Sequence, residues 1–211
     1  YGSVEVFNLE HNLSCLSDQL RMVNNKLIKT GLSNELALIS RYYGGVYFSY
    51  KQAVEIDIIL ETIHKSFPSN HRDLYLAALL GTASDIVDTV GKHFAQPIKA
   101  RDAKGKIKST VYNKAVKDKT IDVIALYKDW LLKYKSLTKN DLCHSTMQGD
   151  FENCLRNLPD NVRTVYADPP YTRDHYSRYY HVLETLTLRD IPKISTVTIH
   201  GSTHVSNGIY R

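Results

Sequence analysis

The chain has 211 residues, a mass of 24.1 kDa and an ordinary globular composition with 43% hydrophobic and 23% charged residues, which excludes the collagen-like, disulfide-scaffold and wholly disordered classes. Its 27 Lys and Arg exceed its 22 Asp and Glu, and the resulting net charge of +5 and pI near 9.0 favour an anionic partner. Its 3 cysteines lack paired close spacing and no long apolar run is present, so the sequence favours a reducing, cytoplasmic setting without a membrane span.

The first segment with a regular pattern is predicted to be a βα unit. Val4–Glu10 alternates at first between apolar and polar side chains, which predicts a short strand that ends near Glu10. From Leu13 to Leu27 apolar residues recur at spacings of three and four, which predicts an amphipathic helix that Gly31 ends.

A mostly helical block is predicted over residues 45–140. Residues 49–52, Ser-Tyr-Lys-Gln, have the form of a capping box ahead of periodic apolar residues, and Pro68 is expected to end that helix. Two further helices are predicted, from about 72 to 90 and from about 121 to 137, because apolar residues again recur on one face of each.

The excess of positive charge lies in one stretch, residues 92–119. Its centre, residues 101–106, has turn chemistry and no helical period, which predicts a loop or β-turn. Such a stretch is either a solvated face or, where the partner is a nucleic acid, a phosphate-binding segment. Against only two acidic residues, Asp102 and Asp118, it carries nine basic ones: Lys92, Lys99, Arg101, Lys104, Lys106, Lys108, Lys114, Lys117 and Lys119.

A β-rich run returns near the C-terminal end. Residues 151–158 are predicted to form a short helix, and 162–167 a strand that ends at Asp168-Pro169-Pro170-Tyr171. Two prolines cannot continue a strand ladder, so the chain must turn at the carboxyl end of the strand, which is the edge where open α/β sheets bind ligands. One more strand-like segment covers 195–200.

The four residues at that turn suit one chemical task, which is to hold a planar heterocycle by its amino group. The Asp168 carboxylate and the Pro169 carbonyl can accept both N–H hydrogens of the amine and so aim its lone pair at an electrophile. Tyr171 would stack on the ring, and the base would have to leave the duplex at a cost of about a few kcal/mol. The alternative is that the tetrapeptide is only a turn with a half-buried aromatic side chain.

With its surroundings this motif resembles the amino-methyltransferases of DNA, in particular the Dam-like adenine methyltransferases of bacterial restriction-modification systems. The similarity lies in Gly-Val-Tyr-Phe-Ser-Tyr at 45–50, Gln-Gly-Asp-Phe at 148–151, Thr-Val-Tyr-Ala-Asp-Pro-Pro-Tyr-Thr at 164–172 and Tyr-Ser-Arg-Tyr-Tyr-His-Val-Leu-Glu-Thr-Leu at 176–186. It extends over most of the chain, from Val4 to about Asp190, and makes the interpretation as a mere turn much weaker.

The resemblance implies an α/β fold: a Rossmann-like methyltransferase sheet, incomplete in this chain, from residues 1–44 and 141–211. An inserted, mainly helical target-recognition block, residues 45–140, would carry the basic loop. The implied activity is transfer of a methyl group from S-adenosylmethionine to the exocyclic N6 amine of a flipped adenine in double-stranded DNA, without a metal. The alternatives are an RNA methyltransferase acting on an exocyclic base amine and a non-catalytic DNA-binding subunit. A cognate restriction endonuclease is the expected companion in the same system.

The resemblance also implies site residues. Glu10 is placed to accept hydrogen bonds from the ribose hydroxyls of the cofactor, with Asn8 as its rival, unless it is only a solvated carboxylate at a strand end. Phe151 and Asp150, in the Gly-Asp-Phe loop, are expected at the cofactor together with Asp168. The catalytic motif is Asp168, Pro169, Pro170 and Tyr171. The residues expected to bind nucleic acid are Lys99, Arg101, Lys104, Lys106, Lys108, Tyr112, Lys114, Arg173, Tyr176 and Arg178.

Two further expectations concern the frame of the site. The family has a Gly-rich loop, Phe-x-Gly-x-Gly, after its first strand, whereas no Gly-x-Gly occurs in these 211 residues. Because Val4–Glu10 matches the second strand of such a fold, we expect the first strand and its loop to lie before Tyr1 or to come from a partner chain. After the motif, Tyr180, Leu183 and Leu186 are expected in the core, and the single histidines are expected to be structural or surface groups.

Overall fold

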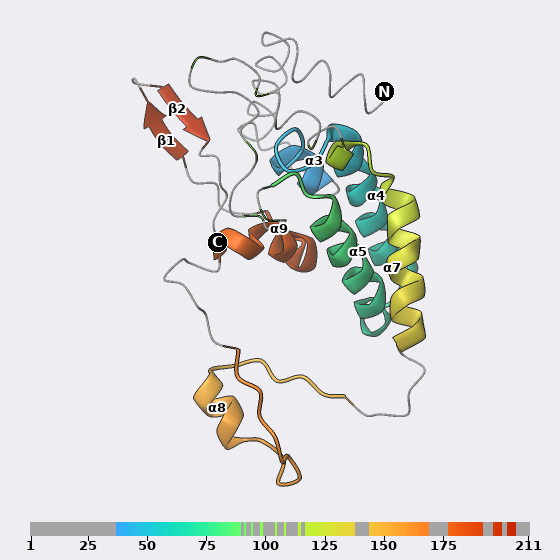
Figure 1. Cartoon of the computed structure of the whole chain (residues 1–211), viewed down its shortest axis with the longest axis vertical. Coiled ribbons are helices and arrows are strands. Elements are labelled where there is room, and N and C mark those ends of the chain that lie inside the picture. The colour runs from blue at the N-terminus through green and yellow to red at the C-terminus, as the bar shows by residue number, and fades with distance from the viewer. Residues whose placement is uncertain are drawn as a thin grey trace.

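The computed structural model describes residues 37–89, 91, 94, 98, 104, 108, 114, 117–137, 144–168, 177–191, 196–199 and 202–205 (Figure 1). Its helices are α3 (Leu38–Tyr42), α4 (Tyr50–Ser66), α5 (Asp73–Ile86), α7 (Val123–Leu137), α8 (Phe151–Arg156) and α9 (Ser177–Leu188), with the 3-10 turn η2 (Ser69–His71). The strands β1 (Thr196–Ile199) and β2 (Ser202–Val205) form an antiparallel pair in which Thr196 faces Val205. The predicted strand Val4–Glu10 and the helix behind it lie outside the described residues.

Helix α4 begins as the sequence predicts, at a capping box. The Ser49 hydroxyl accepts a hydrogen bond from the Gln52 amide at 3.2 Å, and the Gln52 side-chain oxygen accepts one from the Ser49 amide at 3.0 Å. These bonds satisfy two amides that the first turn of a helix otherwise leaves without a partner. The helix ends at Ser66, just before Phe67 and Pro68, because the residue before a proline disfavours the helical conformation. Both predicted ends are therefore confirmed.

Helices α4, α5 and α7 lie side by side and enclose the core (Figure 1). The apolar face predicted for α4 is buried, and so is that of α5 up to Ile86. α7 starts at Val123, two residues later than predicted, where the Asp122 carboxylate accepts a hydrogen bond from the Ala125 amide at 2.9 Å. None of the described helices is long and apolar enough to cross a membrane. The buried apolar residues of α4 and α5 include Ala53, Ile56, Leu60, Ile63, Leu79, Ala83 and Ile86.

Helix α5 is shorter than predicted. It ends at Ile86 rather than near Val90, because Val87 leaves the helical conformation with φ −57° and ψ 130°. The amide of Asp88 then donates to the Tyr47 carbonyl at 2.9 Å instead of continuing the helix. This bond brings the segment after α5 beside the segment that leads into α4.

A buried carboxylate ties α3 to α4. Asp57, in the middle of α4, accepts hydrogen bonds from the amides of Ile39 and Ser40 at 2.8 Å each, and also from the Ser40 hydroxyl. A negative charge is favourable at the N-terminus of a helix, where amides lack partners. Burial raises the pKa of the Asp57 carboxyl, and the hydrogen bonds from Ser40 and Ile39 oppose that rise. The short helix α3 is thus held by a group 17 residues away.

Helix α9, which follows the motif at 168–171, packs on α3 and α5. Leu186 is fully buried and Leu183 packs partly against the core, as predicted, but Tyr180 is 46% exposed, so its assignment to the core is wrong. The buried face of the helix instead contains His181 and Thr185, both at 0% exposure. The helical register therefore differs from the predicted one, because two polar side chains occupy core positions.

The strand predicted over 162–167 is wrong. These residues are described and lie in no strand, and Val165 and Tyr166 are 57% and 86% exposed. A strand needs a neighbour to bond its amides and carbonyls, and within the described part of the chain β1 and β2 pair only with each other. The expected Rossmann-like sheet and the division into 1–44 with 141–211 and 45–140 stay predictions.

Candidate functional site

The proposed cofactor residues Asp150 and Phe151 lie at the start of α8. Asp150 is the N-cap of this helix, and its Oδ1 accepts a hydrogen bond from the Glu152 amide at 3.0 Å, as a short carboxylate does at this position. Its side chain is exposed and has a second oxygen, and the neighbouring Phe151 is 69% exposed. The Asp150 carboxylate can accept a hydrogen bond from an exocyclic amine, and the Phe151 ring can stack on the base that carries it. These two residues therefore fit the adenine part of S-adenosylmethionine.

Asp168 is the member of the predicted catalytic motif that the structure describes. Its side chain is exposed and follows the exposed run 162–167. In Figure 1 the segment that contains α8 lies apart from the cluster formed by α3, α4, α5, α7 and α9. The structure therefore places Asp150, Phe151 and Asp168 in one exposed stretch, residues 144–168, and does not bring them against the helical core.

Several predicted site residues lie outside the described residues. For Arg178 the structure gives only its place in the first turn of α9. The roles assigned to all of these residues stay predictions. The predicted residues outside the described part are Glu10, Lys99, Arg101, Lys106, Tyr112, Pro169, Pro170, Tyr171, Arg173 and Tyr176.

The lysines of the basic stretch that the structure describes differ in exposure. Lys104 and Lys108 are exposed. The Lys114 ammonium lies 2.6 Å from Asp118 Oδ2 and donates to the Thr89 carbonyl at 3.3 Å. Lys114, predicted to bind nucleic acid, thus already has two partners within the fold.

Lys119 is the most buried of the cations that the structure describes in this stretch, with a side chain that is 2% exposed. Its ammonium lies 3.8 Å from a carboxylate oxygen of Asp88, whose side chain is 4% exposed. Desolvating two charges costs free energy that their attraction offsets only in good geometry, so this pair fixes a position more than it adds stability. Asp88 carries no motif in the sequence, and sequence reasoning missed it.

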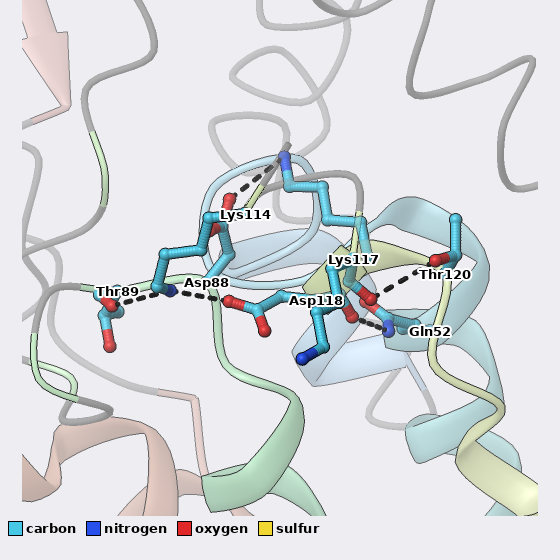
Figure 2. Close-up of polar contacts among 8 residues, drawn as sticks. Gln52, Asp88, Thr89, Lys114, Lys117, Asp118 and Thr120 are labelled. Carbon is cyan, nitrogen blue, oxygen red and sulfur yellow. Dashed lines mark hydrogen bonds and ion pairs between the residues drawn. The ribbon is translucent and has the colours of Figure 1, made fainter. Parts of the chain in front are cut away.

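Gln52 links the same network to the start of α4. Besides its part in the capping box, its Nε2 donates to the Asp118 carbonyl at 2.8 Å and to the Ile121 carbonyl at 3.3 Å. Figure 2 shows Gln52, Asp88, Thr89, Lys114 and Asp118 converging at this point. The capping-box pattern predicted the helix start, but it gave no sign that the same glutamine also holds the end of the basic stretch.

Among the described residues, no group of three or more His, Cys, Asp or Glu is arranged to hold a metal ion. The described part of the site thus consists of exposed carboxylates and an aromatic face on one segment, and lysines on another. These are groups that bind amines, rings and phosphates.

Comparison with known families defines the class of protein. The family of D12 class N6 adenine-specific DNA methyltransferases matches residues 92–209, more than half of the chain. The chain therefore belongs to this family, which confirms the resemblance carried by the motif. The matched range includes the basic stretch, Asp150, Phe151 and the residues 168–171.

A named relative supports the same assignment. The chain is 26% identical over 174 residues to a protein named Type II methyltransferase M.FokI, from Planomicrobium okeanokoites. The aligned part is 77% of this chain but only 23% of the relative, so the chain spans less than a quarter of that protein's length. No solved structure matches the chain.

Proposed function

We propose that this chain is part of an adenine-specific DNA methyltransferase, which transfers a methyl group from S-adenosylmethionine to N6 of an adenine flipped out of double-stranded DNA. The observation that carries the proposal is Asp168-Pro169-Pro170-Tyr171 inside the range that matches the D12 family. We further propose that it acts in the cytoplasm, beside a cognate restriction endonuclease.

Asp168 would act on the target amine. The lone pair of an exocyclic amine is conjugated into the ring, so the nitrogen is a poor nucleophile. A carboxylate and a carbonyl, those of Asp168 and Pro169, that accept its two hydrogens keep the lone pair available and orient it. The nitrogen would then take the methyl group while sulfur keeps the electron pair of the broken carbon–sulfur bond, and the proton released by the methylated amine would pass to water.

Asp150 and Phe151 would hold the adenosine part of the methyl donor. When bound, S-adenosylmethionine supplies a methyl group made electrophilic by the positive sulfur. The exposed Asp150 carboxylate offers an acceptor to its adenine amine, and the exposed Phe151 ring offers a stacking face. Glu10 is the proposed acceptor for the ribose hydroxyls.

The basic stretch would contact DNA phosphates. Lys104 and Lys108 are exposed; Lys99 and Arg101 precede them in the sequence, and Lys106 lies between them. Cations that replace condensed counterions on DNA give binding a steep dependence on salt, with a slope of about −0.9 per phosphate contact.

Asp168→Asn tests the chemical step. We expect radiolabelled methyl transfer to duplex DNA to fall by about 100-fold or more, as when one hydrogen-bonding partner of a transition state is removed, while DNA affinity is kept. Asp160→Asn is the matched control, because Asp160 is also exposed and lies in the same stretch. An unchanged rate for Asp168→Asn would refute the mechanism.

The same assay separates the two alternatives. Transfer to RNA but not to duplex DNA would favour an RNA methyltransferase. DNA binding without transfer by the complete protein would favour a non-catalytic DNA-binding subunit.

A further inference from the structure

Both ends of the basic stretch are bonded to one small region of the fold. On the entering side, Tyr47 Oη donates to the Phe94 carbonyl at 2.9 Å, and the Ile98 amide donates to the Asp88 carbonyl at 3.4 Å. Phe94 is 2% exposed, and its ring centroid lies 5.9 Å from that of Tyr47. The chain therefore enters the stretch from a buried, aromatic anchor.

On the leaving side, two carboxylates hold the lysines. Asp118 Oδ2 pairs with Lys114 at 2.6 Å, and Asp88 pairs with Lys119 at 3.8 Å. Lys114 also donates to the carbonyl of Thr89, the residue after Asp88. Figure 2 shows this side of the network, with the Gln52 amide on the Asp118 carbonyl.

Asp88 thus bonds to both ends, with its carbonyl on Ile98 and its carboxylate on Lys119. The residues between Ile98 and Lys114 include five cations and a single acid, Asp102. Fixing the ends of such a segment lowers the entropy that it must lose on binding. Holding the two ends together would therefore lower the entropic cost of placing the segment on DNA.

We infer that Asp88 and Asp118 are positioning residues for DNA binding. Asp88 would hold the two ends of the basic segment together, and Asp118 would orient Lys114 toward the Thr89 carbonyl at the leaving end, so that the cations between the ends meet the phosphate backbone. This inference rests on the proposed function. It assigns the two acids a role opposite to the one expected from charge, since an acidic residue near a DNA-binding segment ordinarily weakens binding.

Asp118→Asn gives a test in which the two explanations differ in sign. The variant gains one positive charge, so electrostatics alone predicts tighter binding to DNA. Loss of the tie to Lys114 predicts binding weaker by about fivefold and a salt slope reduced by about one or two contacts, at about 0.9 each. The Lys114 side chain is 44% exposed, so water can solvate its ammonium in the variant.

Asp122→Asn is the matched control. Asp122 is exposed and lies four residues along the chain, and asparagine caps a helix as well as aspartate does. We expect binding tighter by about twofold, the effect of one screened surface charge. If Asp118→Asn also binds tighter, or binds as the wild type does, the role of Asp118 is refuted.

Asp88→Asn combined with Lys119→Met tests the other tie without changing the net charge. We expect DNA affinity about tenfold lower, KM for DNA raised by a similar factor and kcat unchanged at saturating DNA, because the chemical groups are untouched. Circular dichroism checks that the variant is folded; removing both members of a buried pair is tolerated far better than removing one. A folded variant with the affinity and salt slope of the wild type would refute the role of Asp88.

If the double variant fails to fold, Asp118→Asn against Asp122→Asn decides the inference alone. Fluorescence anisotropy of the complete protein on labelled duplex DNA, at several salt concentrations, supplies the affinities and salt slopes. Radiolabelled methyl transfer to the same duplex supplies KM and kcat. A wild-type protein that shows no salt-dependent DNA binding would refute the proposed function itself, which is a different outcome from wild-type binding that the variants leave unchanged.

Discussion

Replacing Tyr43 by Phe tests the contact that joins the segment after α3 to α9. The Tyr43 ring is fully buried, and its hydroxyl lies 2.9 Å from Thr185 Oγ1 and 3.4 Å from the His181 carbonyl. Because α9 follows the proposed catalytic motif in the sequence, this contact links the helical core to the helix next to that motif.

The structure sets the size of the effect. Thr185 Oγ1 also donates to the His181 carbonyl at 2.8 Å. The Thr185 hydroxyl therefore keeps a partner when the Tyr43 hydroxyl is removed. We therefore expect Tyr43→Phe to lower the free energy of unfolding by about 1 kcal/mol, the net worth of one neutral hydrogen bond. Tyr43→Ala also removes the ring, whose centroid is 5.7 Å from that of His181 and 5.9 Å from that of Tyr47, and should cost about 3–5 kcal/mol.

Urea unfolding followed by circular dichroism measures both values, with an unchanged m-value showing that the same surface is exposed. Thr185→Val completes a double-mutant cycle with Tyr43→Phe, and we expect a coupling of about 0.5–1.5 kcal/mol between the two hydroxyls. Zero coupling, or a Tyr43→Phe cost as large as that of Tyr43→Ala, would show that the two side chains do not meet as described.

Three further changes test the rest of the helical core. The pKa of His64 is lowered by burial and, to a smaller extent, by the charges of Arg189 and Arg72. The unfolded chain therefore binds a proton at His64 more readily than the folded chain, so the free energy of unfolding should fall as pH drops below about 6.5. His64→Gln should make the urea midpoint less dependent on pH in this range. A Cβ at Gly81 would lie 2.7 Å from the Trp130 ring, so Gly81→Ala should lower the free energy of unfolding by about 1–2 kcal/mol. In a Trp130→Ala background the clash is absent and the helix propensity of alanine acts alone, so the same substitution should stabilise the protein. Since Arg189 has φ 52°, thermal unfolding should show Arg189→Gly to be more stable than Arg189→Ala by about 1 kcal/mol, and equal stability would contradict a left-handed backbone there.

The sequence predicts features that are encoded within a few neighbouring residues. The capping box from Ser49 to Gln52 and the stop at Pro68 are of this kind, because both act through local backbone bonds. The motif at 168–171 is equally local, and its tetrapeptide pointed to the family that the comparison confirmed. The end of α5 was predicted too late, since the bond that ends it comes from Tyr47, far away in the chain.

The register of α9 shows why tertiary contacts escape a hydrophobic pattern. His181 and Thr185 read as polar positions, but Tyr43 and Tyr47 provide them with an aromatic and hydrogen-bonded pocket. Their burial turns Tyr180 toward solvent. The strand predicted over 162–167 is absent for a related reason: within the described part of the chain no strand pairs with these residues, and β-rich composition gives a strand only where a neighbour exists to pair with it.

The cations of the basic stretch can serve either to pair with carboxylates inside the fold or to contact DNA phosphates. The salt dependence of DNA binding distinguishes these two roles. Lys114 and Lys119 are paired with Asp118 and Asp88 inside the fold, so if these pairs persist at most seven of the nine cations can contact phosphates. At about −0.9 per phosphate contact, seven cations give a slope of log K against log salt no steeper than about −6, whereas all nine would allow about −8. The contribution of this stretch is the difference in salt slope between the wild type and a variant in which the nine cations are neutralised. A difference near −8 would mean that the internal pairs open when the protein binds DNA. A slope of −6 or shallower is the result expected if the two lysines stay paired with Asp88 and Asp118 on DNA.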